Sequence, residues 1–94
     1  LSPGEFDPVS GRITWPLLLK SKAFDDDRAA MEELFAEVAT TERLSFDQYQ
    51  QIRELGARMQ KQLNAMIREV SAKDHMKATS FLTSLLYEAR LVAG

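Results

Sequence analysis

The chain has 94 residues, which is enough for one small domain and too few for two separate hydrophobic cores. Hydrophobic residues make up 45% and charged residues 28%, close to the averages of globular proteins, so the composition excludes a largely disordered chain. Cysteine is absent, which excludes disulfides and thiol catalysis, and a net charge of −2 gives no overall attraction to nucleic acid.

The start of the chain and its charge distribution suggest a setting for the protein. Leu1 stands where a start methionine would be, so we favour an exported or periplasmic protein whose leader was removed, with a larger parent protein as the alternative. Residues 1–52 hold 5 basic and 10 acidic side chains, and residues 53–94 hold 7 and 4, so the two halves are expected to attract each other. The longest apolar run, Leu17 to Leu19, is far shorter than the roughly 18 residues of a membrane span.

Residues 1–15 are predicted to form an extended arm on a single helical domain of residues 1–94. Prolines and glycines interrupt any regular pattern in its first part. Ile13 and Trp15 then alternate with polar residues, and Pro16 favours an extended conformation at Trp15. No second strand-like run is present to pair with this stretch, so we expect an isolated extended segment.

A first amphipathic helix is predicted over residues 25–39. Three aspartates, residues 25–27, open it, because carboxylates are favoured at the positive amino end of a helix dipole. One face of the helix is apolar and comprises Phe24, Met31, Leu34, Phe35 and Val38. This face is expected to contact the core.

The second and longest helix is predicted over residues 46–70. Ser45 and Gln48 have the spacing of a capping box, in which each side chain accepts a hydrogen bond from the other residue's backbone. An apolar stripe follows and comprises Tyr49, Ile52, Leu55, Gly56, Met59, Leu63, Met66, Ile67 and Val70. Because Gly56 has no side chain, it leaves a notch in this stripe, and we predict that Trp15 docks there.

The third helix is predicted over residues 75–92. No Gly or Pro separates Val70 from Met76, so one continuous helix through both segments is an alternative. A new apolar stripe, starting at Ala78 in its own phase, argues instead for a turn at residues 71–73, with Asp74 capping the third helix. Three helices with short connections favour antiparallel neighbours. The predicted fold class is therefore all-α, a small up-down-up three-helix bundle with an extended amino-terminal arm.

No side-chain cluster in the sequence predicts catalysis or metal binding. Residues 25–27 lack the alternating ligands, turn glycine and distal Glu of a calcium loop. His75 is the only histidine, whereas a zinc site needs several converging ligands. Glu32, Glu33 and Glu37 lie one turn apart, but nothing in the pattern buries them. We therefore expect a protein that is not an enzyme and has no catalytic, cofactor-binding or metal-binding residues.

A basic series along the second helix and beyond it supports an alternative function, weak nucleic-acid binding. The series comprises Arg53, Arg58, Lys61, Arg68, Lys73 and Lys77. Glu54 and Glu69 interrupt it, and no aromatic residue is interleaved for base stacking. A solvated helix face is the preferred interpretation, and nucleic acid is not an expected partner.

The stretch from Ala78 to Tyr87 has no charged residue, although solvated helix faces usually carry Lys and Glu. Met76 and Leu91 fall near Tyr87 on the side turned away from the apolar stripe, which predicts a second, mildly apolar surface. Either the arm or a partner covers this surface, and a small bundle gains stability from a second copy. Met76, Tyr87 and Leu91 are therefore candidate interface residues.

The function favoured by the sequence is protein–protein contact by a small, self-associating helical protein, with a homo-oligomer or an unidentified protein as partner. The alternative is a bundle that binds a small apolar ligand. That alternative predicts a cavity lined by Met59, Met66 and Phe81.

Overall fold

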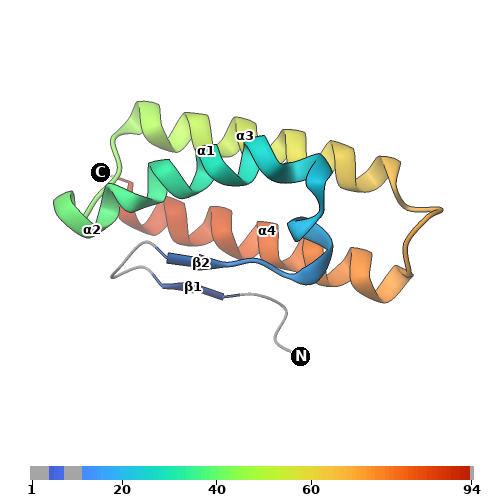
Figure 1. The fold of residues 1–94 in the computed structure, drawn as a ribbon. Coiled ribbons are helices and arrows are strands. Elements are labelled where there is room, and N and C mark those ends of the chain that lie inside the picture. The colour runs from blue at the N-terminus through green and yellow to red at the C-terminus, as the bar shows by residue number, and fades with distance from the viewer. Residues whose placement is uncertain (1–4, 8–11, 94) are drawn as a thin grey trace.

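Three long helices form the fold, and the computed structural model describes residues 5–7 and 12–93 of the chain (Figure 1). Helices α1 (Asp25–Ala36), α3 (Phe46–Ala65) and α4 (Ala72–Val92) lie side by side, and each runs antiparallel to the one before it. The predicted all-α, up-down-up three-helix bundle is confirmed.

Helix α1 begins at Asp25, where it was predicted, and ends before the predicted residue 39. A separate short helix, α2 (Val38–Thr41), follows a break at Glu37. The hydroxyls of Thr40 and Thr41 donate to the Glu37 carbonyl at 3.0 and 2.8 Å. Hydroxyl bonds of this kind bend a helix because they compete with its backbone ladder.

The amino end of α3 has the predicted capping box. The backbone N–H of Gln48 donates to Ser45 Oγ at 3.1 Å, and the N–H of Ser45 donates to Gln48 Oε1 at 2.8 Å. Two of the four amide donors that a helix start leaves unpaired are thereby satisfied.

The predicted extension of this helix to residue 70 is wrong, because α3 ends at Ala65. Met66 N donates to Leu63 O at 3.1 Å, a three-residue spacing that tightens the last turn and ends the helix. The apolar period continues past this point through Ile67, yet Ile67 lies in the turn and is 56% exposed. The position of Ile67 fits the helical repeat of the sequence although this residue lies in a turn, so the predicted helix was too long.

Helix α4 begins at Ala72, three residues before the predicted start, and ends at Val92. Ser71 caps it, since the backbone N–H of Asp74 donates to Ser71 Oγ at 3.1 Å. The predicted cap at Asp74 is therefore wrong, and the hydroxyl one turn earlier takes that role. The turn before Ser71 also excludes a single continuous helix.

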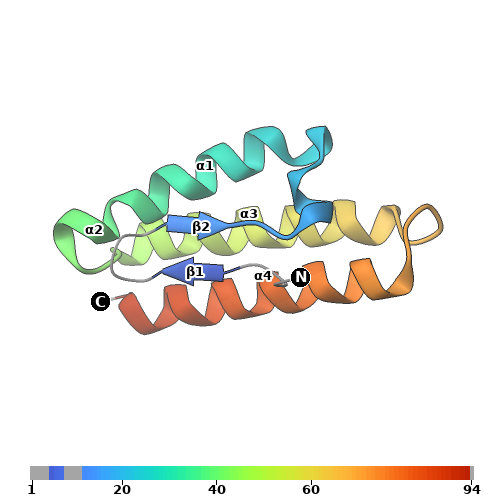
Figure 2. The ribbon, with the colours of Figure 1, turned by 60° about the horizontal axis from the view of Figure 1, so that its bottom comes forward.

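A short hairpin replaces the predicted isolated segment. Strand β1 (Glu5–Asp7) pairs antiparallel with β2 (Arg12–Thr14), with Phe6 opposite Ile13. The expectation failed because three residues are too few to display a strand period in the sequence. The 3₁₀ turns η1 (Leu17–Lys20) and η2 (Lys22–Phe24) lead from the hairpin into α1. Figure 2 shows the strands over the space between α1 and α4.

One hydrophobic core joins all three long helices with η1 and η2. Its largest fully buried side chains are Phe24, Phe35, Leu19, Met31, Leu44, Ile52, Met59, Leu63 and Leu85. Leu44 precedes α3, and its N–H donates to the carbonyl of Val92 at 2.8 Å, so the start of α3 is fastened to the last turn of α4.

Candidate functional site

From Met76 to Leu91, a stripe along the outward face of α4 is uncharged and open to solvent, with Lys73 beyond its amino end and Arg90 on its flank. Its large members, Met76, Tyr87 and Leu91, are 66%, 61% and 61% exposed. Between them lie three small exposed residues, Ser80, Thr83 and Ser84. These six residues are called the α4 stripe below. In the part of the chain that the structure describes, the arm leaves Met76, Tyr87 and Leu91 exposed.

A hollow of about 380 Å³ adjoins the amino end of the stripe. It is lined by Ile67, Ala72, His75, Met76, Thr79 and Ser80. His75 Nε2 lies 3.1 Å from Asn64 Oδ1, a hydrogen bond that links α4 to α3 beside the turn. Because Met76 and Ser80 belong to both features, the hollow and the α4 stripe form one continuous surface.

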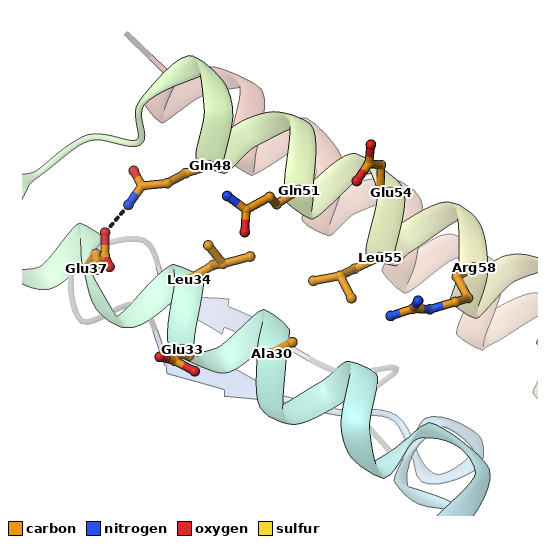
Figure 3. A pocket seen from close by; sticks show the side chains of 9 residues that line it. All are labelled: Ala30, Glu33, Leu34, Glu37, Gln48, Gln51, Glu54, Leu55 and Arg58. Atoms are coloured by element: carbon orange, nitrogen blue, oxygen red, sulfur yellow. Dashed lines mark hydrogen bonds between the residues drawn. The ribbon is translucent and has the colours of Figure 1, made fainter.

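A second concave feature, the α1–α3 cleft, has a volume of about 510 Å³ (Figure 3). Leu34 from α1 and Leu55 from α3 point into the space between the two helices, and Ala30 leaves room there because its side chain is a single methyl group. The polar lining residues are Glu33, Glu37, Gln48, Gln51, Glu54 and Arg58. The cleft therefore has an apolar floor and a polar rim, on which three glutamates outnumber one arginine.

Polar contacts close the two ends of the α1–α3 cleft. At one end the Gln48 amide donates to the Glu37 carboxylate (Figure 3). At the other end Arg58 donates through Nη2 and Nε to Asp27 Oδ1 at 2.7 and 3.1 Å. The hydrogen bond and the charge of Asp27 raise the pKa of the Arg58 guanidinium above its ordinary value. Arg58 is therefore cationic throughout the physiological range and neutralises the buried Asp27 carboxylate.

Trp15 and Gly56, the predicted docking pair, have different neighbours in the structure. Trp15 is 6% exposed, packs edge-on against Phe81 with ring centroids 5.5 Å apart, and donates from Nε1 to Glu32 at 3.3 Å. The space beside Gly56 is taken by Leu86, which would lie 3.1 Å from an added Cβ. The glycine does mark a close approach, but the approaching residue comes from α4. Replacing Gly56 by Leu would therefore displace Leu86.

The cavity expected for a small apolar ligand is not one of the two concave features. Met59 is fully buried and Phe81 is 5% exposed, and neither lines the hollow or the α1–α3 cleft. Met66 packs against the core as a partly buried residue. These three side chains therefore contribute to packing.

The six residues of the basic series have different surroundings in the structure. Arg58 faces α1 through Asp27, and the guanidinium carbon of Arg53 lies 6.0 Å from the ring centroid of Tyr49. A guanidinium over an aromatic ring makes a cation–π contact. Two of the six basic side chains are thus engaged within the chain.

Sequence reasoning missed the α1–α3 cleft and the hollow. The acidic residues of the cleft were assigned to solvated faces of separate helices, and only the packing of α1 against α3 places them around one cleft. Figure 3 shows Glu33 on the outer edge of α1 and Glu54 on the outer edge of α3, on opposite sides of that cleft. The hollow depends on Ile67, whose exposure follows from where α3 ends. A Gly or Pro just after Ala65 would have indicated the early end of α3, but the sequence has neither there.

Within residues 5–7 and 12–93, no three His, Cys, Asp or Glu side chains are grouped as metal ligands. In the same part of the chain, no helix has the length and hydropathy to cross a membrane. Comparisons of the sequence with protein-family models, with curated proteins and with solved structures found no match. The fold defines a small all-α three-helix bundle, and its function must be inferred from the α4 stripe and the two concave features.

Proposed function

We propose that this protein is a non-catalytic helical module that acts through protein contacts, and that it self-associates through the α4 stripe. The observation that carries the proposal is the stripe itself, which is uncharged, exposed and arranged symmetrically along the helix. In a closed homodimer a patch meets the same patch of the other subunit, so it must be complementary to itself.

The stripe has the symmetry that such a dimer needs. Met76 and Leu91 are equally distant from its midpoint, and so are Ser80 and Tyr87. If two α4 helices pack antiparallel about a twofold axis at this midpoint, Met76 lies opposite the partner's Leu91. Ser80 then lies opposite the partner's Tyr87, so that a small side chain faces a large one.

The middle of the stripe favours a close approach of the two helices. Thr83 and Ser84 flank the proposed axis and are both small. The partner's Tyr87 then meets a gap between four residues at the i, i+3, i+4 and i+7 spacing that accepts a side chain in helix packing. These four residues are Met76, Thr79, Ser80 and Thr83, and the first three line the hollow.

Charges on one flank of the stripe are also complementary in this arrangement. At 3.6 residues per turn, Lys77 and Glu88 lie on the same flank, roughly 70° and 90° from the centre of the stripe. The twofold axis keeps each flank on its own side while exchanging the ends. Lys77 is therefore placed beside the partner's Glu88, twice in each dimer, and contact there steers the antiparallel orientation.

A single helix pair covers less than the roughly 800 Å² per partner of a standard stable interface. We therefore expect a concentration-dependent dimer with a dissociation constant on the order of micromolar.

Thr83→Cys tests the register of the proposed dimer. The chain has no cysteine, so the new thiol is the only one present. Beside the twofold axis, the two Cα atoms fall in the range of about 4.4–6.8 Å that a disulfide spans. We expect mild oxidation to convert most of the variant to a covalent dimer on a non-reducing gel. Ala57→Cys, exposed on α3, is the matched control, and equal cross-linking of the two variants contradicts the register.

Leu91→Glu tests the interface without cross-linking. Each new carboxylate would be packed against the partner's Met76, and because moving a charge out of water against an apolar side chain is costly, the dimer is expected to dissociate. The measurement is sedimentation velocity or light scattering at high micromolar concentration. Leu17→Glu is the matched control because Leu17 is an exposed leucine outside α4. A monomeric unmodified chain at that concentration would rule out self-association.

A further inference from the structure

We propose that the α1–α3 cleft binds a basic amphipathic helix of another protein. This inference goes beyond self-association, and it rests on a separate surface, because the cleft and the α4 stripe share no residue. Three properties of the cleft carry it: its floor, its rim charge and its length.

The floor provides apolar contact that the chain itself leaves incomplete. Leu34 is only partly buried, although it belongs to the apolar face of α1 and packs against the core. Leu55 enters the same space from α3 (Figure 3). An apolar side chain inserted there would remove the partly buried Leu34 and Ala30 from water and would contact Leu55, which is only 9% exposed. This is the kind of contact that a helix-in-groove complex uses.

The net negative charge of the rim favours a partner with basic side chains. Glu33, Glu37 and Glu54 line the cleft, and the one basic lining residue, Arg58, is already bonded to Asp27. The lining carboxylates therefore exceed the available positive charge. Lysine or arginine residues on both sides of the partner's apolar stripe would meet this rim, whereas phosphate groups of nucleic acid or anionic lipid would be repelled.

The length of the cleft fits a helix. Its two closed ends, at Gln48 and Arg58, are ten residues apart on α3, which corresponds to about 15 Å along a helix axis. About ten residues of a bound helix span that distance and present apolar residues at positions i, i+4 and i+7. Laid between α1 and α3, the bound helix would convert three packed helices into four.

A synthetic peptide can serve as the probe. It carries leucines at i, i+4 and i+7, lysines flanking that stripe and alanine elsewhere, and its counterpart has Glu in place of every Lys. Binding is followed by amide shifts in ¹H–¹⁵N spectra of the full chain carrying Leu91→Glu, so that self-association does not compete. We expect the lysine peptide alone to bind, with shifts centred on Ala30, Leu34, Gln51 and Leu55 and an affinity that falls as salt rises.

Charge reversal on the rim gives the decisive comparison. The Glu33→Lys/Glu54→Lys variant is expected to lose about tenfold in affinity for the lysine peptide. Glu42→Lys/Glu69→Lys makes the same change in net charge at exposed sites outside the cleft and should lose less than about twofold. All four sites are exposed, so circular dichroism should show both variants folded.

Three results would overturn the inference. The first is equal loss of affinity in the two charge-reversed variants, the second is binding of the glutamate peptide as tightly as the lysine peptide, and the third is amide shifts centred on the hollow or the α4 stripe. If the unmodified chain proves monomeric, the same titration is run on that chain, so a failure of self-association and a failure of the cleft remain distinct.

Discussion

Replacing Trp15 by Ala is expected to lower the free energy of unfolding by about 3 to 5 kcal/mol, as removal of a buried aromatic side chain does. The indole is 6% exposed and packs on Phe81 of α4, while its N–H donates to Glu32 of α1. One side chain thus holds the segment after the hairpin against two helices. A domain of this size has a total stability of about 5 to 15 kcal/mol, so the loss should be visible directly in a urea melt.

Trp15→Phe is the matched control for this prediction. A phenyl ring keeps part of the apolar contact with Phe81, but it is smaller than the indole and has no N–H to donate to Glu32, so a loss of roughly 1 to 2 kcal/mol, less than that of the Ala variant, is expected. The indole is also the only one in the chain, and it should emit at short wavelength and resist iodide quenching. A red-emitting, freely quenched tryptophan in the unmodified chain, with Ala and Phe variants equally stable, would show that the segment does not dock.

Leu63→Ala is expected to destabilise the fold by about 2 to 5 kcal/mol. Leu63 is fully buried on α3, and the close-packed surroundings of a core leucine relax only partly when its side chain is removed. The effect therefore combines lost burial with a residual cavity. Chemical denaturation followed by circular dichroism gives the value.

Lys61→Ala is the comparison on the same helix. Lys61 is exposed, and alanine has at least the same helix propensity, so the change should stay within about 0.5 kcal/mol of zero. Similar losses at Leu63 and Lys61 would mean that α3 is rotated about its axis relative to the structure described above.

The starts of the helices were predictable from sequence to different degrees. At Ser45 the donor and the acceptor of each hydrogen bond are three residues apart, so the capping box can be read before any tertiary structure is known. At α4 the same chemistry allowed two choices, Ser71 and Asp74, and the sequence did not distinguish them. The end of α3 was lost because Ile67 continued the apolar repeat.

Features that depend on two elements at once could not be predicted. Gly56 correctly indicated that another element comes close, but a missing side chain does not identify its neighbour, and Leu86 was found where Trp15 was expected. The α1–α3 cleft likewise depends on the rotation of two helices and on the distance between them. The apolar pattern of one helix specifies neither. The exposed face of α4 was different, since an uncharged back face can be recognised within one helix.

The hydrogen bond from Leu44 to Val92 has a consequence for the dynamics of the bundle. The last turn of an isolated helix frays, since its final carbonyls have no partner in the helix. Here the carbonyl of Val92 is occupied by an amide that lies far away in sequence, just before α3. Unwinding the end of α4 therefore requires detaching the entry to α3, and these two segments should open as one cooperative unit. Leu91 lies in that turn, so its side chain is presented from a backbone whose local opening is suppressed.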